Sequence, residues 1–314
     1  MQLPRTRRHH RAQRGVLDLK LLTQPDDGIA PLLKAIGEAR DQIAIVIFRF
    51  DQRDLEKALA AAVTRGVPVR ALIAHTNSDG CKQLRDLELR LLSQGITVSR
   101  TADHFVRYHD KLLIVDKAAL YVLGFNFTHI DMARSRSFGL VTTNADLVKT
   151  ALTLFECDCS RQPFTIDRED FIISPLNARE RLSALISSAR ETLNIYDPKL
   201  TDRTMLRLLR ERAEKGVKIR IIGRTGLRGM GLESRKLESQ RLHVRAILKD
   251  DRQLFIGSQS LRAVELDHRR EAGLIVSDQA AIRTFRDVFE HDWCQCTAKP
   301  EARPKPTRPT LTTA

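Results

Sequence analysis

Two copies of one phrase, 134 residues apart, carry the residues of this chain that are best suited to chemistry. They read His109-Asp-Lys111 followed by Asp116, and His243-Val-Arg245 followed by Asp250. Because histidine titrates near neutrality, one imidazole can attack as a neutral nucleophile while the other donates a proton. A lysine and an arginine beside them can neutralise the oxygens of a phosphate. The two phrases together predict displacement at phosphorus without a metal ion.

A short turn follows each phrase and adds further polar groups. Asn126 in the first turn, and Ser258 or Ser260 in the second, are predicted to donate hydrogen bonds to phosphate oxygens. Asp116 and Asp250 lie five residues after the Lys or Arg of their phrase. We expect these two carboxylates to anchor loops rather than to contact a substrate.

The phrases belong to a longer internal repeat. Residues 24–70 align with residues 174–220 at a constant offset of 150. From His109 onward the offset is 134, so the first half holds 16 additional residues between Gly66 and His109. A repeat of this length indicates a duplicated domain. One reactive histidine from each half can then meet the other at a single interface.

Each half is predicted to alternate strands and helices. Buried strands are expected at 20–23, 43–48, 67–73, 112–115, 119–123, 193–196, 217–222, 244–248 and 253–256. Helices are expected at 55–64, 146–158, 204–215 and 279–293. This order predicts an α/β fold of two pseudo-symmetric halves, each a mixed and largely parallel sheet flanked by helices, with the active site at their interface. On a strand, His109 and Lys111 would project from one face, as would His243 and Arg245.

Shifts in composition set the expected boundaries. A basic arm at 1–17 and a Pro-rich basic tail at 297–314 are both expected to be disordered. Between them lie the two halves, at 18–165 and 166–296. The region 77–94 of the first half is expected to form a helix behind a Ser-Asp-Gly turn, whereas the second half has a glycine-rich connection at 223–231.

The spacing H-x-K-x4-D, followed by a turn of the form G-S/G-x-N, resembles the signature of the phospholipase D superfamily. The resemblance covers about residues 18 to 296 and implies catalysis by both histidines, with no cofactor. The sequence departs from the signature in having Arg245 where members commonly have Lys. It also has Leu123 where the first turn would begin with Gly, and Ser260 where the second would have Asn.

Many members of the superfamily also place a carboxylate 28 residues after each motif histidine, where it often reaches the histidine of the opposite half. Glu271 stands at that position in the second half, and Ser137 in the first. Only His109 is therefore expected to have a carboxylate behind it. This asymmetry favours His109 as the nucleophile and His243 as the general acid, and the reverse assignment stays open.

The resemblance implies a metal-independent phosphodiesterase or phosphatidyltransferase that forms a phosphohistidine, similar to bacterial phospholipase D and cardiolipin synthase. Its substrates would be anionic or zwitterionic phospholipids at a membrane surface. A first alternative is an endonuclease that cleaves nucleic-acid phosphodiesters. A second is a non-catalytic protein that binds anionic phosphate in a degenerate site.

Composition limits the partners and the compartment. The net charge of +14 favours an anionic partner but does not choose between lipid and nucleic acid. Because no run of 18 apolar residues occurs and the N-terminus lacks a secretory signal, we expect a cytoplasmic monomer that can bind a membrane peripherally. The pairs Cys157-x-Cys159 and Cys294-x-Cys296 favour reduced thiols over a metal site.

Overall fold

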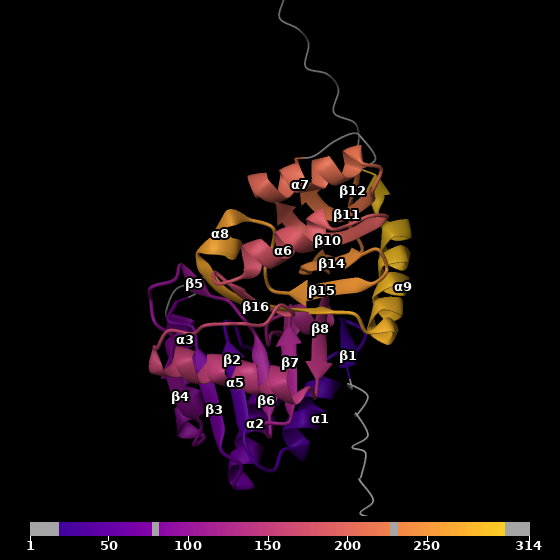
Figure 1. The fold of residues 1–314 in the computed structure, drawn as a ribbon. Coiled ribbons are helices and arrows are strands. Elements are labelled where there is room, and N and C mark those ends of the chain that lie inside the picture. The colour runs from indigo at the N-terminus through magenta and orange to yellow at the C-terminus, as the bar shows by residue number, and fades with distance from the viewer. Residues whose placement is uncertain (1–18, 77–81, 227–231, 299–314) are drawn as a thin grey trace, which may run out of the picture.

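Two β-sheets, one in each half of the chain, form the body of the protein (Figure 1). The computed structural model describes residues 19–76, 82–226 and 232–298. The predicted basic arm, most of the predicted tail, the Ser-Asp-Gly turn with Cys81, and residues 227–231 of the glycine-rich connection lie outside the described residues.

The first sheet has the strand order β1-β8-β7-β6-β2-β3-β4. Its strands are β1 (Leu19–Gln24), β2 (Ile43–Ile47), β3 (Val69–Ile73), β4 (Thr97–Arg100), β6 (Leu112–Val115), β7 (Ala119–Leu123) and β8 (Ser135–Thr142). The helices of this half are α1 (Ala30–Glu38), α2 (Arg53–Thr64), α3 (Lys82–Ser93), α4 (His129–Ala133) and α5 (Ala145–Ser160). Helix α3 confirms the helix that was predicted within residues 77–94.

The second sheet has the order β17-β12-β11-β10-β14-β15-β16-β5, and β9 (Phe171–Ser174) pairs with β16. Its other strands are β10 (Thr192–Leu200), β11 (Lys218–Thr225), β12 (Leu232–Lys236), β14 (Ala246–Lys249), β15 (Gln253–Gly257), β16 (Arg269–Val276) and β17 (Thr297–Ala298). The helices of this half are α6 (Ala178–Ser187), α7 (Arg203–Glu214), α8 (Ala263–Asp267) and α9 (Gln279–Gln295). Strand β17 shows that the first two residues of the predicted tail pair with β12.

The prediction of largely parallel sheets is wrong. In the first sheet β2–β3 and β3–β4 are parallel, as is the pairing of the two-residue strand β13 (Arg241–Leu242) with β8, whereas β1–β8, β8–β7, β7–β6 and β6–β2 are antiparallel. A continuous apolar run shows that a strand is buried on both faces, but it does not show the direction of the strand. The sheets are therefore mixed, as expected, but most of the pairs in the first sheet are antiparallel.

A tight turn joins β6 to β7 and is repeated between β14 and β15. Asp116 and Lys117 both have positive φ, of 54° and 51°, and so do Asp250 and Asp251 in the second half. Two central residues with positive φ match the right-handed twist of the strands in a two-residue hairpin. The first aspartate of each turn also binds the segment that leads into the neighbouring strand. Asp116 accepts hydrogen bonds from the backbone amides of Arg40, Asp41 and Gln42, just before β2. Asp250 accepts the equivalent bonds from Arg190, Glu191 and Thr192.

We expect Asp116→Asn to lower the free energy of unfolding by about 1 kcal/mol at pH 7. Burial acts to raise the pKa of Asp116, but the backbone amides outweigh it and lower this pKa. A lowered pKa gives stability that is present above the pKa of the unfolded carboxyl, roughly 4, and is lost as the pH falls through the folded pKa. Urea unfolding should show a difference from wild type that shrinks under acid. Asp41→Asn, at an exposed neighbouring carboxylate, is the control, and a pH-independent difference would contradict this account.

Three hydrophobic cores hold these layers together. The first lies between the first sheet and α1, α2 and α3, and the second between the second sheet and α6, α7 and α8. The third joins the two halves, because side chains of α5 and α9 pack there with residues of both sheets. Phe138 of β8, Tyr196 of β10 and Phe285 of α9 are in mutual ring contact in this shared core. The two halves are thus packed as one body.

Two buried ion pairs also cross between the halves. Arg136 of β8 makes a two-pronged contact with Asp292 of α9, with distances of 2.8 Å and 3.1 Å. The repeat-equivalent pair joins Arg270 of β16 to Asp158 of α5 at 3.1 Å. Each arginine and each carboxylate is buried. The last helix of each half is therefore held by the arginine of the opposite sheet.

Two short strands are exchanged between the sheets. Strand β5 (Arg107–Tyr108), from the first half, pairs in parallel with β16 of the second. Strand β13 (Arg241–Leu242), from the second half, pairs in parallel with β8 of the first. Each motif phrase begins directly after its exchanged strand and runs into β6 or β14. His109 and His243 thus lie in the short connections between two strands. The expectation that each histidine lies on a strand is wrong.

The helices of the structure also bear on membrane insertion. Among the described residues, no helix combines the length and the apolar character needed to span a bilayer.

Candidate active site

Each motif histidine is held by the sheet of the opposite half. The backbone N–H of His109 donates to the carbonyl of Arg270 at 2.7 Å, and that of His243 donates to the carbonyl of Arg136 at 3.1 Å. These two arginines are the ones whose side chains form the ion pairs across the halves. The exchange of strands therefore brings both phrases to the interface between the halves, as the repeat predicted.

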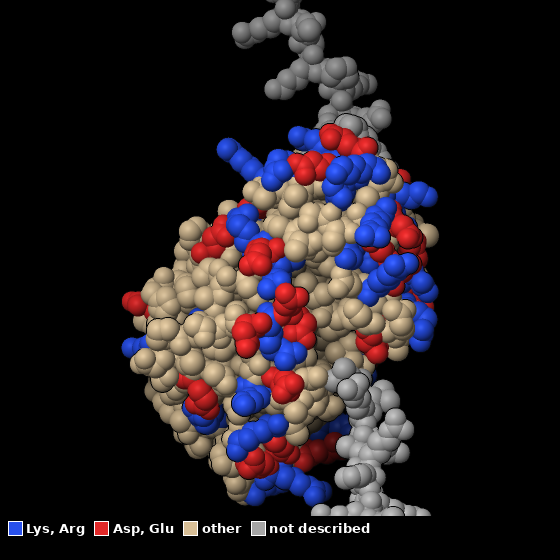
Figure 2. Space-filling view, viewed as in Figure 1, with Lys and Arg blue, Asp and Glu red and all other residues tan. Residues whose placement is uncertain are grey.

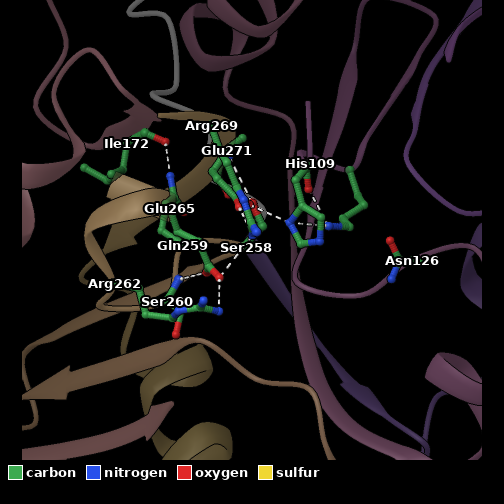
Figure 3. A network of polar contacts seen from close by, with 12 residues as sticks. His109, Asn126, Ile172, Ser258, Gln259, Ser260, Arg262, Glu265, Arg269 and Glu271 are labelled. Atoms are coloured by element: carbon green, nitrogen blue, oxygen red, sulfur yellow. Dashed lines mark hydrogen bonds and ion pairs between the residues drawn. The ribbon is translucent and has the colours of Figure 1, made fainter. Parts of the chain in front are cut away.

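His109 has a carboxylate of the second half behind it. Its Nδ1 lies 2.8 Å from Oε2 of Glu271, and Figure 3 shows Glu271 reaching from β16 toward the ring. Phe48 packs edge-on against the imidazole, with the ring centroids 4.5 Å apart. Burial, followed by the charges of Lys111 and Arg245, lowers the pKa of His109 well below its usual value. A neutral ring with its proton on Nδ1 leaves the Nε2 lone pair available for attack.

Lys111 is fully buried beside His109. Its Nζ donates to the His109 carbonyl, lies 3.0 Å from His109 Nδ1 and is 5.3 Å from the centre of the Phe48 ring. Nδ1 can donate to Glu271 or accept from Lys111, but it cannot do both. Donation to the carboxylate is the charge-assisted and shorter contact, so we assign the ring proton to Nδ1. Burial lowers the pKa of Lys111 to about 7.

Arg245 supplies the second cation of the site. Its Nε and Nη1 atoms are buried and have no hydrogen-bond partner among the described residues. Both Arg245 and Lys111 act to lower the pKa of His109 and of His243, so the charges of the two cations reach both imidazoles. Unsatisfied guanidinium nitrogens in a buried cationic centre are suited to an anion such as a phosphate.

His243 also has a carboxylate near it, and the sequence reasoning missed it. Asp131 Oδ2 lies 3.3 Å from Nδ1 of His243, so the expectation that only His109 has such a neighbour is wrong. Ser137, which was compared with Glu271, instead donates its hydroxyl to the carbonyl of His243 at 2.8 Å. Only the position 28 residues after each histidine was compared, so Asp131 was not considered. Asp131 aligns with Glu265 in the repeat.

The predicted phosphate donors are placed differently in the two halves. Asn126 donates its Nδ2 to Asp131 at 2.7 Å, and its Oδ1 is buried with no partner in the described part of the chain. Ser260 donates its hydroxyl to Asp197. The hydroxyl of Ser258 lies 3.2 Å from the backbone nitrogen of Ala272, which donates to it. Both serine hydroxyls are therefore engaged within the second half.

A cavity of about 150 Å³ borders the His243 side of the site. Asn126, Asp131 and Arg241 line it, together with Gln83 and Leu87 of helix α3. The helix that belongs only to the first half thus reaches the edge of the site, where it can influence which substrates enter. A larger cavity, of about 760 Å³, lies between β1 and α6, and none of the predicted site residues lines it.

The surface charge does not form a single basic patch on the face seen in Figure 2. Lys and Arg side chains there are interspersed with Asp and Glu. Several arginines are paired with carboxylates, for example Arg70 with Glu156 and Arg220 with Glu290. Part of the basic excess, five Arg against one Asp, falls in residues 1–18, which lie outside the described residues.

The cysteine pairs lie at the ends of α5 and α9. Cys157 and Cys159 are half-buried, Cys294 is exposed and Cys296 is buried, and all four are free thiols. Burial raises the pKa of Cys159 and of Cys296 to about 11. Such thiols are protonated near neutral pH, which disfavours attack by sulfur.

Known proteins resemble this chain over most of its length. The family described as "Cardiolipin synthase, PLD-like domain" matches residues 32–159 and 182–293. Cardiolipin synthase B of Escherichia coli (strain K12) is 23% identical over 327 residues, covering 86% of this chain and 78% of that protein.

Two solved structures share the fold. Phosphatidylserine synthase of Haemophilus influenzae Rd KW20 matches with a TM-score of 0.70 and 10% identity over 90% of this chain and 87% of that one. Polyphosphate kinase of Porphyromonas gingivalis matches with a TM-score of 0.75 and 18% identity over 92% of this chain, which spans only 51% of the kinase. These likenesses show that the arrangement of two sheets recurs in other proteins.

Proposed function

Because this chain belongs to the phospholipase D superfamily, we propose that it is a phosphodiesterase or phosphatidyltransferase that acts on phospholipids through a covalent phosphohistidine. One observation carries the proposal: the exchanged strands bring both motif histidines and both cations to the interface between the halves. His109 is already hydrogen-bonded to Glu271 there. No metal ion is required by the scheme that follows.

In the first step Nε2 of His109 attacks phosphorus and the bond to the alcohol breaks. The electron pair of that bond goes to the leaving oxygen, which takes a proton from His243. Lys111 and Arg245 neutralise the charge that gathers on the other phosphate oxygens. Glu271 keeps the proton of His109 on Nδ1 and stabilises the cationic ring of the phosphohistidine.

In the second step the oxygen of a water molecule or another alcohol attacks phosphorus, the P–Nε2 bond breaks, and its electron pair returns to His109. His243, now neutral, takes the proton of the incoming hydroxyl and returns to its starting state. Water gives phosphatidic acid, whereas an alcohol gives a new phosphodiester. The same five residues serve both steps: His109, Lys111, His243, Arg245 and Glu271.

Phospholipid is the substrate class that the comparisons favour. The matching family and the Escherichia coli relative carry the name cardiolipin synthase, and one structural relative is named for phosphatidylserine synthesis. A protein of net charge +14 would be drawn to an anionic bilayer surface. We therefore propose that it works as a peripheral protein at the cytoplasmic face of a membrane.

The first test incubates the protein in EDTA with vesicles of phosphatidylglycerol and phosphatidylethanolamine, and follows products by mass spectrometry. We expect phosphatidic acid or a transphosphatidylated lipid from wild type, and none from His109→Ala. His291→Ala, an exposed histidine on α9, is the matched control and should behave as wild type. If wild type gives no lipid product but cleaves single-stranded DNA in a His109-dependent way, the lipid proposal is wrong and the nuclease alternative is correct.

A further inference from the structure

Asp131 lies within ion-pair distance of His243, whereas the equivalent residue of the other half, Glu265, pairs with other groups. In the second half, Glu271 contacts His109, whereas Glu265 accepts from the backbone N–H of Ser260 at 2.8 Å and pairs with Arg262 and Arg269. In the first half, the equivalent of Glu271 is Ser137, and the equivalent of Glu265 is Asp131. Asp131 is the carboxylate that lies 3.3 Å from Nδ1 of His243.

Local structure fixes the direction of this carboxylate. Asp131 is buried in the short helix α4, and Thr128 at the start of the helix accepts from its backbone N–H at 3.3 Å. Its Oδ2 accepts from the backbone N–H of Asn126 at 2.9 Å and from the Asn126 side chain at 2.7 Å. Its Oδ1 contacts Arg241 of the exchanged strand β13. The Asp131 carboxylate thus accepts three hydrogen bonds, two from Asn126 and one from Arg241, before any substrate binds.

We infer that Asp131 is the positioning residue of His243, and that it supplies the carboxylate which Ser137 cannot provide. This inference rests on the proposed function for its catalytic meaning. The negative carboxylate favours a proton on Nδ1 of His243, so that Nε2 faces the phosphate. Asp131 does not itself take a proton: the proton given to the leaving oxygen comes from Nε2, and the proton on Nδ1 stays in place.

The charges around His243 make a nearby anion important. Burial and the cations Arg245, Lys111 and Arg241 all lower the pKa of His243, and Asp131 is the group that raises it. Without Asp131, the protonated ring that the first step needs would face these three cations with no carboxylate beside it. The contact of Asp131 with His243, at 3.3 Å and without a hydrogen bond to Nδ1 among the described residues, is weaker than the 2.8 Å hydrogen bond between Glu271 and His109. The stronger support for His109 fits its role as nucleophile.

A first experiment tests the contact without needing turnover. Histidine titration by NMR should show that Asp131→Asn lowers the pKa of His243 by roughly one unit, while the pKa of His109 is unchanged. Glu265→Gln is the matched control for His243, because Glu265 stands at the equivalent position and acts on His109. An unchanged His243 pKa in Asp131→Asn, or an equal fall of the His243 pKa in Glu265→Gln, would overturn the inference.

A second experiment asks whether the contact serves proton donation. Phosphatidyl-p-nitrophenol releases a stable anion that needs no proton, whereas phosphatidylglycerol releases an alcohol that does. We expect Asp131→Asn to slow turnover of phosphatidylglycerol by roughly 10²-fold and to keep the initial burst of p-nitrophenolate. Loss of both by the same factor would mean that Asp131 only supports the fold.

Relocating the charge gives a further check. Ser137→Glu places a carboxylate at the position that Glu271 occupies in the repeat, and adding it to Asp131→Asn should restore part of the phosphatidylglycerol activity and raise the His243 pKa again. A rescued pKa with no rescue of turnover would overturn the catalytic part of the inference. If wild type acts on neither lipid, the proposed function fails, while the NMR experiment still decides whether Asp131 sets the state of His243.

Discussion

His243→Ala should trap a phosphohistidine on His109 and reduce steady-state turnover by roughly 10²–10⁴-fold, the usual contribution of a general acid and base. Without His243, attack by His109 remains feasible for a substrate with a good leaving group, but no base activates the water or alcohol of the second step. The covalent intermediate should therefore accumulate. Rapid mixing with phosphatidyl-p-nitrophenol, an alkaline quench and peptide mass spectrometry would locate the phosphoryl group.

His109→Ala provides the opposite case. It removes the nucleophile, so no phosphohistidine should form at any position and turnover should be abolished. A phosphohistidine found on His243 in this variant would reverse the assignment of the two roles. His291→Ala should form and discharge the intermediate at the wild-type rate, because this exposed side chain lies at the far end of α9.

Asp292→Asn should cost about 3–5 kcal/mol of unfolding free energy, the usual effect of breaking a buried ion pair from one side. Asp292 accepts two hydrogen bonds from Arg136 and a third, at 2.7 Å, from the hydroxyl of Tyr196. Replacement of the Asp292 carboxylate leaves the buried Arg136 guanidinium with Asp26, a largely exposed carboxylate 3.0 Å away, as its remaining charged partner among the described residues. Guanidinium-induced unfolding followed by circular dichroism would measure the difference.

Glu290→Gln is the matched control for this change. Glu290 lies on the same helix and pairs with Arg220 of its own half, but both side chains are partly exposed, so its loss should cost about 1 kcal/mol or less. The double variant Arg136→Met with Asp292→Leu should be more stable than Asp292→Asn, because it leaves no buried unpaired charge, and Asp26, the other partner of Arg136, is largely exposed. Equal costs for Asp292→Asn and Glu290→Gln would show that the pair across the halves contributes little.

The sequence predicted the parts of this protein that depend on repeated spacing. The offsets of 150 and 134 revealed the duplication, and the position 28 residues after His243 identified Glu271, which does contact His109. Most buried strands were located because their apolar runs are continuous. These signals need no knowledge of how the halves are packed.

What the sequence did not reveal depends on pairing between distant segments. Strands β5 and β13 have only two residues each, too few for any period, so their exchange could not be foreseen. Strand direction was misjudged because the hairpin turns use Asp-Lys and Asp-Asp rather than the Asn-Gly or Asp-Gly pairs that usually mark them. Asp131 was missed because its contact with His243 depends on the positions of α4 and of the exchanged strand β13, which spacing alone does not reveal.

The exchange of β5 and β13 also determines how the site responds to dilution. Each half supplies the backbone carbonyl that holds the histidine of the other, so a complete centre needs both halves in contact. Residues 161–170 join α5 to β9 and keep the halves at a high effective concentration, because their association is intramolecular. A site built from two separate chains would come apart as protein becomes scarce. Because both motif histidines belong to one chain, we expect the specific activity to be independent of the protein concentration.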